Sequence, residues 1–152
     1  MGDQILLEVK DLFVQYTSGG DVIHAVNGVS FAVKPGTTLG LVGETGAGKT
    51  SVAKAILRIL PDPPAKVTAG EIYFDGKELL GAPESEMLKI RGGKISMIFQ
   101  DPMTALNPVM TIGSQIAEVI RIHNSISKQE AERRAIEMLN VVGIVAERYH
   151  EY

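Results

Sequence analysis

Residues 43–50 read GETGAGKT, a stretch that places three glycines and one lysine in eight positions. The apolar run TLGLV at residues 38–42 comes directly before it, and this run predicts a buried strand. After it, apolar side chains recur at helical spacing until prolines intervene. Those side chains are Val52, Ala53, Ile56, Leu57 and Leu60, and the prolines are Pro61, Pro63 and Pro64. The sequence therefore predicts a strand, a glycine-rich turn and a helix over residues 50–60.

The turn fits the pattern G-x-x-x-x-G-K-[ST] from Gly43 to Thr50, which is typical of a phosphate-binding loop. Its glycines permit positive φ and leave room for a phosphate, and the start of a helix favours an anion. Lys49 supplies a charge for the β- and γ-phosphates, and the Thr50 hydroxyl suits Mg²⁺. The other interpretation is a glycine-rich turn with an exposed lysine. The candidate phosphate-binding residues are Gly43, Glu44, Thr45, Gly46, Ala47, Gly48, Lys49, Thr50 and Ser51.

Composition excludes several other classes of protein. The chain has 152 residues, 45% of them hydrophobic, and a net charge of −3, whereas nucleic-acid-binding domains usually carry a basic excess. It has no cysteine, which removes disulfides, thiol catalysis and zinc–thiolate sites. His24, His123 and His150 are too far apart in sequence for metal-ligand spacing. The polar start MGDQILLEVKD does not fit a signal peptide, and no apolar run is long enough to span a bilayer, so we expect a cytosolic protein.

The remaining chain changes from strands to helices. Short β-branched or aromatic runs predict strands at residues 4–9, 12–16, 22–26, 29–33, 71–74 and 94–99. Residues 83–90 fit a short helix. From residue 111 the spacing is helical, with Ile112, Ile116, Val119 and Ile120 on one stripe. Ser127 and Glu130 form a capping box for a second helix, which turns Ala135, Ile136, Leu139 and Val142 inward.

Two segments of the chain resemble ABC-transporter ATPase subunits. They are residues 6–57, LLEVKDLFVQYTSGGDVIHAVNGVSFAVKPGTTLGLVGETGAGKTSVAKAIL, and residues 95–118, ISMIFQDPMTALNPVMTIGSQIAE. FQDPMTALNP at residues 99–108 is particularly similar to the branch that imports oligopeptides and dipeptides, which includes nickel and glutathione importers. The resemblance implies an α/β fold, the ABC type of P-loop NTPase. Residues 1–110 would hold an N-terminal antiparallel β-subdomain and an incomplete RecA-like core, and residues 111–152 would begin a helical subdomain.

The resemblance also assigns roles to single residues. Thr45 to Ser51 match the phosphate-binding loop, and Tyr16 matches an aromatic position that stacks on adenine. Gln100 matches the Q-loop glutamine, which approaches Mg²⁺ and the γ-phosphate. We therefore expect ATP and Mg²⁺ as cofactors, Lys49 and Gln100 as catalytic residues, and Thr50 and Gln100 near the metal. A core tyrosine and a solvent-exposed glutamine are the alternatives for Tyr16 and Gln100.

Partners follow from the same resemblance. The Q-loop region faces transmembrane permease subunits in this family, and our hypothesis is that Met103, Leu106, Val109 and Met110 receive a coupling helix. A core position is the alternative for these four. We further expect a second ATPase subunit in a head-to-tail dimer, an extracytoplasmic solute-binding protein that acts indirectly, and a peripheral location on the inner face of the cell membrane. No nucleic acid is expected.

The 152 residues contain no LSGG-like signature and no apolar run that ends in Asp-Glu. The resemblance therefore covers roughly the first half of such a subunit. We expect these residues alone to bind nucleotide weakly, if at all, to hydrolyse little ATP, and to self-associate through unpaired strand edges. A non-transport ABC ATPase and a small P-loop kinase remain the alternatives, although the segment 99–108 favours transport and the arginines do not cluster as a kinase lid. The cargo is not encoded in this sequence.

Overall fold

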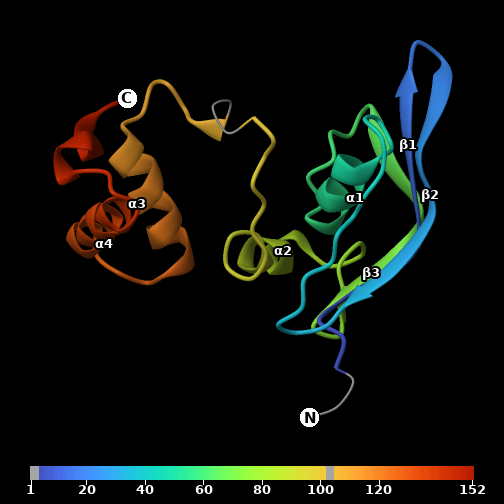
Figure 1. Ribbon diagram of the computed structural model, residues 1–152, viewed down its shortest axis with the longest axis horizontal. Coiled ribbons are helices and arrows are strands. Elements are labelled where there is room, and N and C mark those ends of the chain that lie inside the picture. The colour runs from blue at the N-terminus through green and yellow to red at the C-terminus, as the bar shows by residue number, and fades with distance from the viewer. Residues whose placement is uncertain (1–3, 102–104) are drawn as a thin grey trace. The chain divides into compact units, whose positions relative to one another are not determined.

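The β-branched and aromatic residues of the first half form an antiparallel sheet, and the helical periodicity of the second half forms a small helical unit. The computed structural model describes residues 4–101 and 105–152. It divides into two compact units, one that ends at Leu88 and one from Lys89 to Tyr152. Figure 1 shows the strands and α1 in the first unit and α3 and α4 in the second. The predicted subdomain boundary after residue 110 stays a prediction.

The sheet has four strands in the order β2-β1-β3-β4, and each neighbouring pair is antiparallel. Their bounds are β1 Leu7–Ser18, β2 Asp21–Val33, β3 Ala65–Phe74 and β4 Lys77–Glu78. The runs predicted as separate strands at residues 4–9 and 12–16 are one strand, because the chain passes through an irregularity without leaving the sheet. Asp11 adopts a positive φ of 43° there, and its N–H donates to Ser30 Oγ at 2.8 Å.

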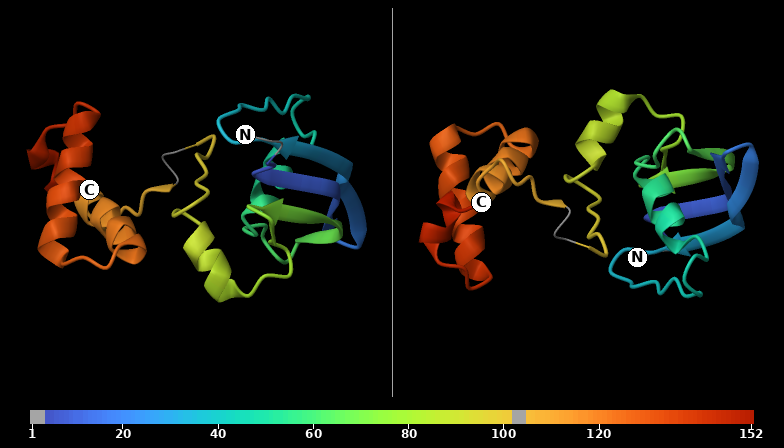
Figure 2. Two further views of the ribbon diagram at one scale, coloured as in Figure 1. Left: turned by 90° about the horizontal axis from the view of Figure 1, so that it is seen from below. Right: turned by 90° about the horizontal axis from the view of Figure 1, so that it is seen from above.

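Helix α1, Lys49–Ile56, lies against one face of this sheet and contacts β1 and β2 (Figure 2). Its apolar side chains Val52, Ala55 and Ile56 are buried, as are Val14 of β1 and Val26 of β2. The helix ends before the predicted Leu60 because Arg58 turns to a positive φ of 52°. The Arg58 guanidinium then donates to the carbonyl oxygens of Leu79 and Ala82. Helix α2, Glu84–Ile90, follows β4.

Two predicted strands are wrong for the structure described. In the ranges 4–101 and 105–152, no residue pairs with residues 38–42, and residues 94–99 make only a single bridge between Arg91 and Ile95. Most of their side chains are open to solvent, with Val42 90% and Ile98 92% exposed. An apolar strand is buried only when other strands and helices cover it, and the described segments supply no such neighbours.

The second unit is built on α3, Ile112–His123, α4, Lys128–Val141, and the short 3-10 helix η2, Ala146–His150. The predicted cap forms, because Ser127 Oγ accepts a hydrogen bond from the Glu130 N–H at 3.2 Å. The Glu130 carboxylate pairs with Arg133 and Arg134. Buried side chains form one cluster: Ala117, Ala131, Ala135, Leu139 and Tyr149. Val119 and Val142, which the periodicity turned inward, are exposed.

Tyr149 fixes η2 to the start of α3. A Cβ atom on Gly113 would lie 2.0 Å from Tyr149 Cδ2, so only glycine leaves space for the ring at this position. The Ile112 N–H also donates to the Glu151 carbonyl oxygen at 2.7 Å.

Within the described residues, none of the helices combines the length and the apolarity that a membrane crossing requires.

Candidate functional site

The glycine-rich loop is seated against the sheet at one residue. Gly48 is the N-cap of α1 and has a φ of 81°, in the left-handed region that side chains rarely adopt. A Cβ atom on it would lie 2.0 Å from the carbonyl oxygen of Ala25 in β2. The second glycine of the sequence pattern is therefore required by packing as well as by φ. It sets where α1 begins relative to β2.

The first turn of α1 offers backbone donors without helical partners. The bond from the Val52 N–H to the Gly48 carbonyl oxygen, 3.0 Å long, links residues four positions apart. The N–H groups of Lys49, Thr50 and Ser51 precede it and have no acceptor within the helix. Gly48 has no side chain to cap them, and the first turn carries no acidic residue. These donors and the helix dipole fit a phosphate group.

Lys49 is folded back onto the loop that precedes it. Its Nζ donates to the carbonyl oxygens of Gly43 at 2.6 Å and Glu44 at 2.7 Å. The Ala47 N–H donates to the same Glu44 oxygen at 3.1 Å, which closes the turn. Hydrogen bonds from a charged donor are stronger than neutral ones, so the lysine stabilises the loop conformation. The ammonium group thereby lies beside the backbone that the sequence pattern assigns to phosphate binding.

Tyr16 joins this loop through its hydroxyl group. It lies near the end of β1, where it is paired with Ile23 of β2 and Ala65 of β3. The Tyr16 hydroxyl is 3.1 Å from Ser51 Oγ in the first turn of α1. Two residues that the resemblance places in the nucleotide site are thus in direct contact. The ring is half-buried, and its role in base stacking stays a prediction.

The other sequence-predicted residues lie in the second unit. Gln100 is exposed, and its catalytic and metal-binding roles stay predictions. Leu106 and Val109 are exposed rather than in the core, and Met110 is half-buried. Met103 falls outside the described residues. Leu106 and Val109 therefore form part of an open surface.

Sequence analysis missed the residue that shapes this surface. Gln115 Oε1 accepts from the Asn107 N–H at 2.9 Å, and Gln115 Nε2 donates to the carbonyl oxygens of Asn107 and Met110, each at 3.0 Å. Asn107 Oδ1 accepts from the Val109 N–H at 3.1 Å. One side chain of α3 thus holds residues 107–110 in place. The available signal is a glutamine in the first turn of a predicted helix, eight positions after the asparagine of an Asn-Pro pair.

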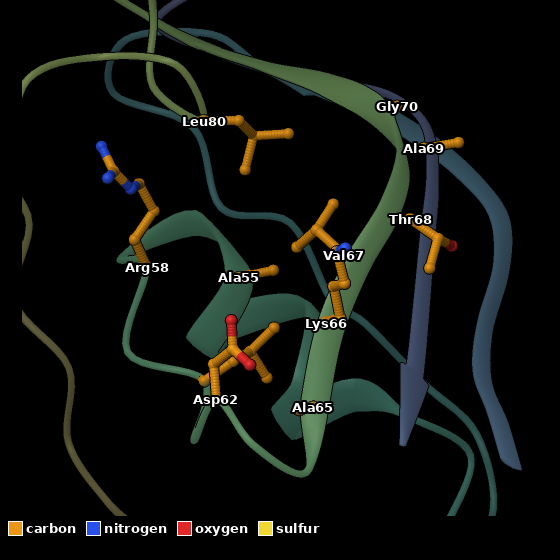
Figure 3. A pocket seen from close by; sticks show the side chains of 11 residues that line it. Ala55, Arg58, Asp62, Ala65, Lys66, Val67, Thr68, Ala69, Gly70 and Leu80 are labelled. Atoms are coloured by element: carbon orange, nitrogen blue, oxygen red, sulfur yellow. The ribbon is translucent and has the colours of Figure 1, made fainter. Parts of the chain in front are cut away.

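A pocket of about 410 Å³ lies at the other end of α1 (Figure 3). Arg58, Asp62 and Lys66 supply charged groups at its edge, and Ala55, Ala65 and Val67 line its apolar part. It contains no residue of the glycine-rich loop, and the Arg58 guanidinium is engaged by backbone carbonyl oxygens. Where the structure describes the chain, no three His, Asp or Glu side chains group as a metal site. The loop and Tyr16 are therefore the candidate functional site.

Comparisons with known proteins extend over most of the chain. A model of the ABC transporter family matches residues 26–152. The oligopeptide transport ATP-binding protein OppD of Bacillus subtilis (strain 168) is 49% identical over 139 residues, which are 91% of this chain and 39% of that protein. The dipeptide transport ATP-binding protein DppD of the same strain is 45% identical over 149 residues, 97% of this chain and 44% of that protein. The chain spans about two fifths of the length of these curated relatives.

Solved structures share the same arrangement. The dimeric structure of MJ0796, a bacterial ABC transporter cassette, matches with a TM-score of 0.79 and 26% identity, over 96% of this chain and 60% of that chain. A dimeric post-hydrolysis state of the ATP-binding cassette MJ0796, bound to ADP and Pi, has a TM-score of 0.80 at 24% identity, over 95% of this chain and 60% of that chain. The second likeness concerns the fold alone. Together they confirm the predicted fold class.

Proposed function

The chain belongs to the ABC transporter family, and we propose that it forms the nucleotide-binding part of an ATP-binding subunit that drives import of peptides or related small solutes. The observation that carries this proposal is the loop at residues 43–51, seated on the sheet by Gly48 and joined to Tyr16 through Ser51. The names of the relatives, which are oligopeptide and dipeptide transport ATP-binding proteins, support the peptide branch.

Each residue of the loop has a role that follows from its position. The N–H groups of Lys49, Thr50 and Ser51 donate to phosphate oxygens at the start of α1. The Lys49 ammonium group gives up its hydrogen bonds to the carbonyl oxygens of Gly43 and Glu44 and donates to oxygens of the β- and γ-phosphates instead. Tyr16 offers a flat ring to the adenine base.

Thr50 fits a magnesium site because its hydroxyl lies on the second residue of α1, next to the phosphate-binding N–H groups. We propose Thr50 as a residue that holds Mg²⁺, which when bound would neutralise charge on the β- and γ-phosphates. Gln100, in the second unit, is exposed, and its contact with the metal is proposed from the family resemblance alone. Hydrolysis is proposed for the whole subunit, because the chain spans only about two fifths of its relatives.

The proposed partners are a second ATP-binding subunit, permease subunits at the inner face of the membrane and, indirectly, a solute-binding protein. Leu106 and Val109 are exposed, and Gln115 holds residues 107–110 in place; this exposed segment supports the permease contact. The solved dimers of a cassette with the same fold support the paired subunit. Co-purification with membrane subunits separates the transport role from that of an ABC ATPase that acts elsewhere.

Calorimetric titration of the chain with ADP tests the site directly. We expect weak but measurable binding, which Lys49→Ala reduces by about 10-fold or more because it removes charge-assisted hydrogen bonds of roughly 1.5–3 kcal/mol. Lys54→Ala is the matched control. Lys54 lies in the last turn of the same helix, away from the phosphate-binding turn, so this variant should bind ADP with the wild-type affinity. Equal binding by wild type and Lys49→Ala, or no binding by the wild type, contradicts the proposal.

A further inference from the structure

The contact between Tyr16 and Ser51 links two elements that are 35 positions apart in sequence. Tyr16 points to the same face of β1 as Val14, since side chains two residues apart in a strand share a face. Val14 is fully buried on that face, which α1 covers. Ser51 lies within the first turn of α1, among the N–H groups assigned to phosphate. The ring of Tyr16 is therefore tied to the phosphate-binding turn itself.

We propose that Ser51 is a positioning residue for the Tyr16 ring, and that this contact determines how well the site selects a nucleotide over a bare phosphate compound. The proposal rests on the proposed function. A half-buried tyrosine near a strand end can turn about χ1 unless something restrains it. The hydroxyl–hydroxyl bond supplies that restraint and keeps the ring at a fixed place relative to the phosphate donors.

This restraint affects the base and not the phosphates. A ligand that carries both groups has to meet the ring and the phosphate-binding turn at once, so a ring that is already ordered lowers the entropy lost on binding. A ligand without a base meets only the loop and gains nothing from the ring. Pyrophosphate and ADP therefore separate the role of the contact from the integrity of the loop.

The test measures the affinities of ADP and pyrophosphate for the wild type, Tyr16→Phe, Ser51→Ala and the double variant. Tyr16→Phe keeps the aromatic face and removes only the hydroxyl. We expect it to weaken ADP binding about two- to tenfold, as for release of one ordered side chain, and to leave pyrophosphate binding unchanged. In the Ser51→Ala background the same change should have no further effect on ADP, because the bond is already lost. Ser51→Thr keeps a hydroxyl and should retain the wild-type affinity.

Two results overturn the proposal: unchanged ADP affinity in Tyr16→Phe, or the same loss in both backgrounds. A second measurement, of the χ1 rotamer of residue 16, does not depend on nucleotide binding. Three-bond couplings should show one χ1 rotamer for residue 16 in the wild type and averaged rotamers in Tyr16→Phe and Ser51→Ala. If the wild type binds pyrophosphate but not ADP, the proposed nucleotide function fails, and the rotamer measurement alone then decides whether Ser51 positions the ring.

Discussion

Gly46 and Gly48 separate two reasons for a glycine in this loop, which are a positive φ and a lack of space for a Cβ atom. Both have positive φ, at 86° and 81°. An added Cβ on Gly46 meets nothing within 4 Å, whereas one on Gly48 meets the Ala25 carbonyl oxygen. Gly46→Ala should therefore cost only the left-handed backbone, about 1–2 kcal/mol, and Gly48→Ala should cost about 1–3 kcal/mol more from overpacking. Chemical denaturation measures both, and equal losses would show that β2 yields to the new side chain.

The residues of this loop were predictable from sequence, and their contacts were not. The pattern from Gly43 to Thr50 is local, because its glycines and lysine act within one turn of chain. The seat of Gly48 on Ala25 depends on how β2 packs beside α1, and the bond from Tyr16 to Ser51 depends on where β1 ends. Neither contact joins residues at a sequence spacing that predicts it.

Helix α4 has a charge cluster that makes its stability depend on pH. Hydrogen bonds from Arg133 and Arg134 lower the pKa of Glu130 from 4.5 to about 2. A carboxyl whose pKa is lowered in the folded state stabilises it fully above pH 4.5, and this contribution declines as the pH falls toward 2. Thermal melting of the helical signal should therefore show a steeper loss below pH 4.5 in the wild type than in Glu130→Gln.

Elements held by local signals were predicted better than elements that need distant partners. The cap at Ser127 and the apolar spacing of α4 placed that helix correctly. The apolar runs 38–42 and 94–99 are typical strands in composition, yet a strand exists only through its neighbours, and the described residues supply none. Val142 was misplaced because α4 ends at Val141 and Val142 is its C-cap, and Val119 was misplaced because the buried side of α3 runs through Gly113 and Ala117.

The whole chain should self-associate through its two exposed apolar segments. Val42 and Ile98 are almost fully exposed, in segments that join no described strand of the sheet, and unpaired apolar segments invite pairing with another chain. Light scattering over a concentration series should show growth of oligomers. Val42→Lys and Ile98→Lys should each reduce it, because a charge opposes pairing at an edge. Ile122→Lys changes an apolar side chain that is 68% exposed but lies within helix α3, so it should have less effect. A monomer at every concentration would refute this expectation.

The contacts of Lys49 with Gly43 and Glu44 make ligand binding at the loop an exchange rather than a simple addition. Two short bonds from the ammonium group to backbone oxygens are broken when phosphate oxygens take their place, so much of the enthalpy gained is offset by enthalpy lost. The carbonyl oxygens of Gly43 and Glu44 thus compete with phosphate oxygens for the Lys49 ammonium group.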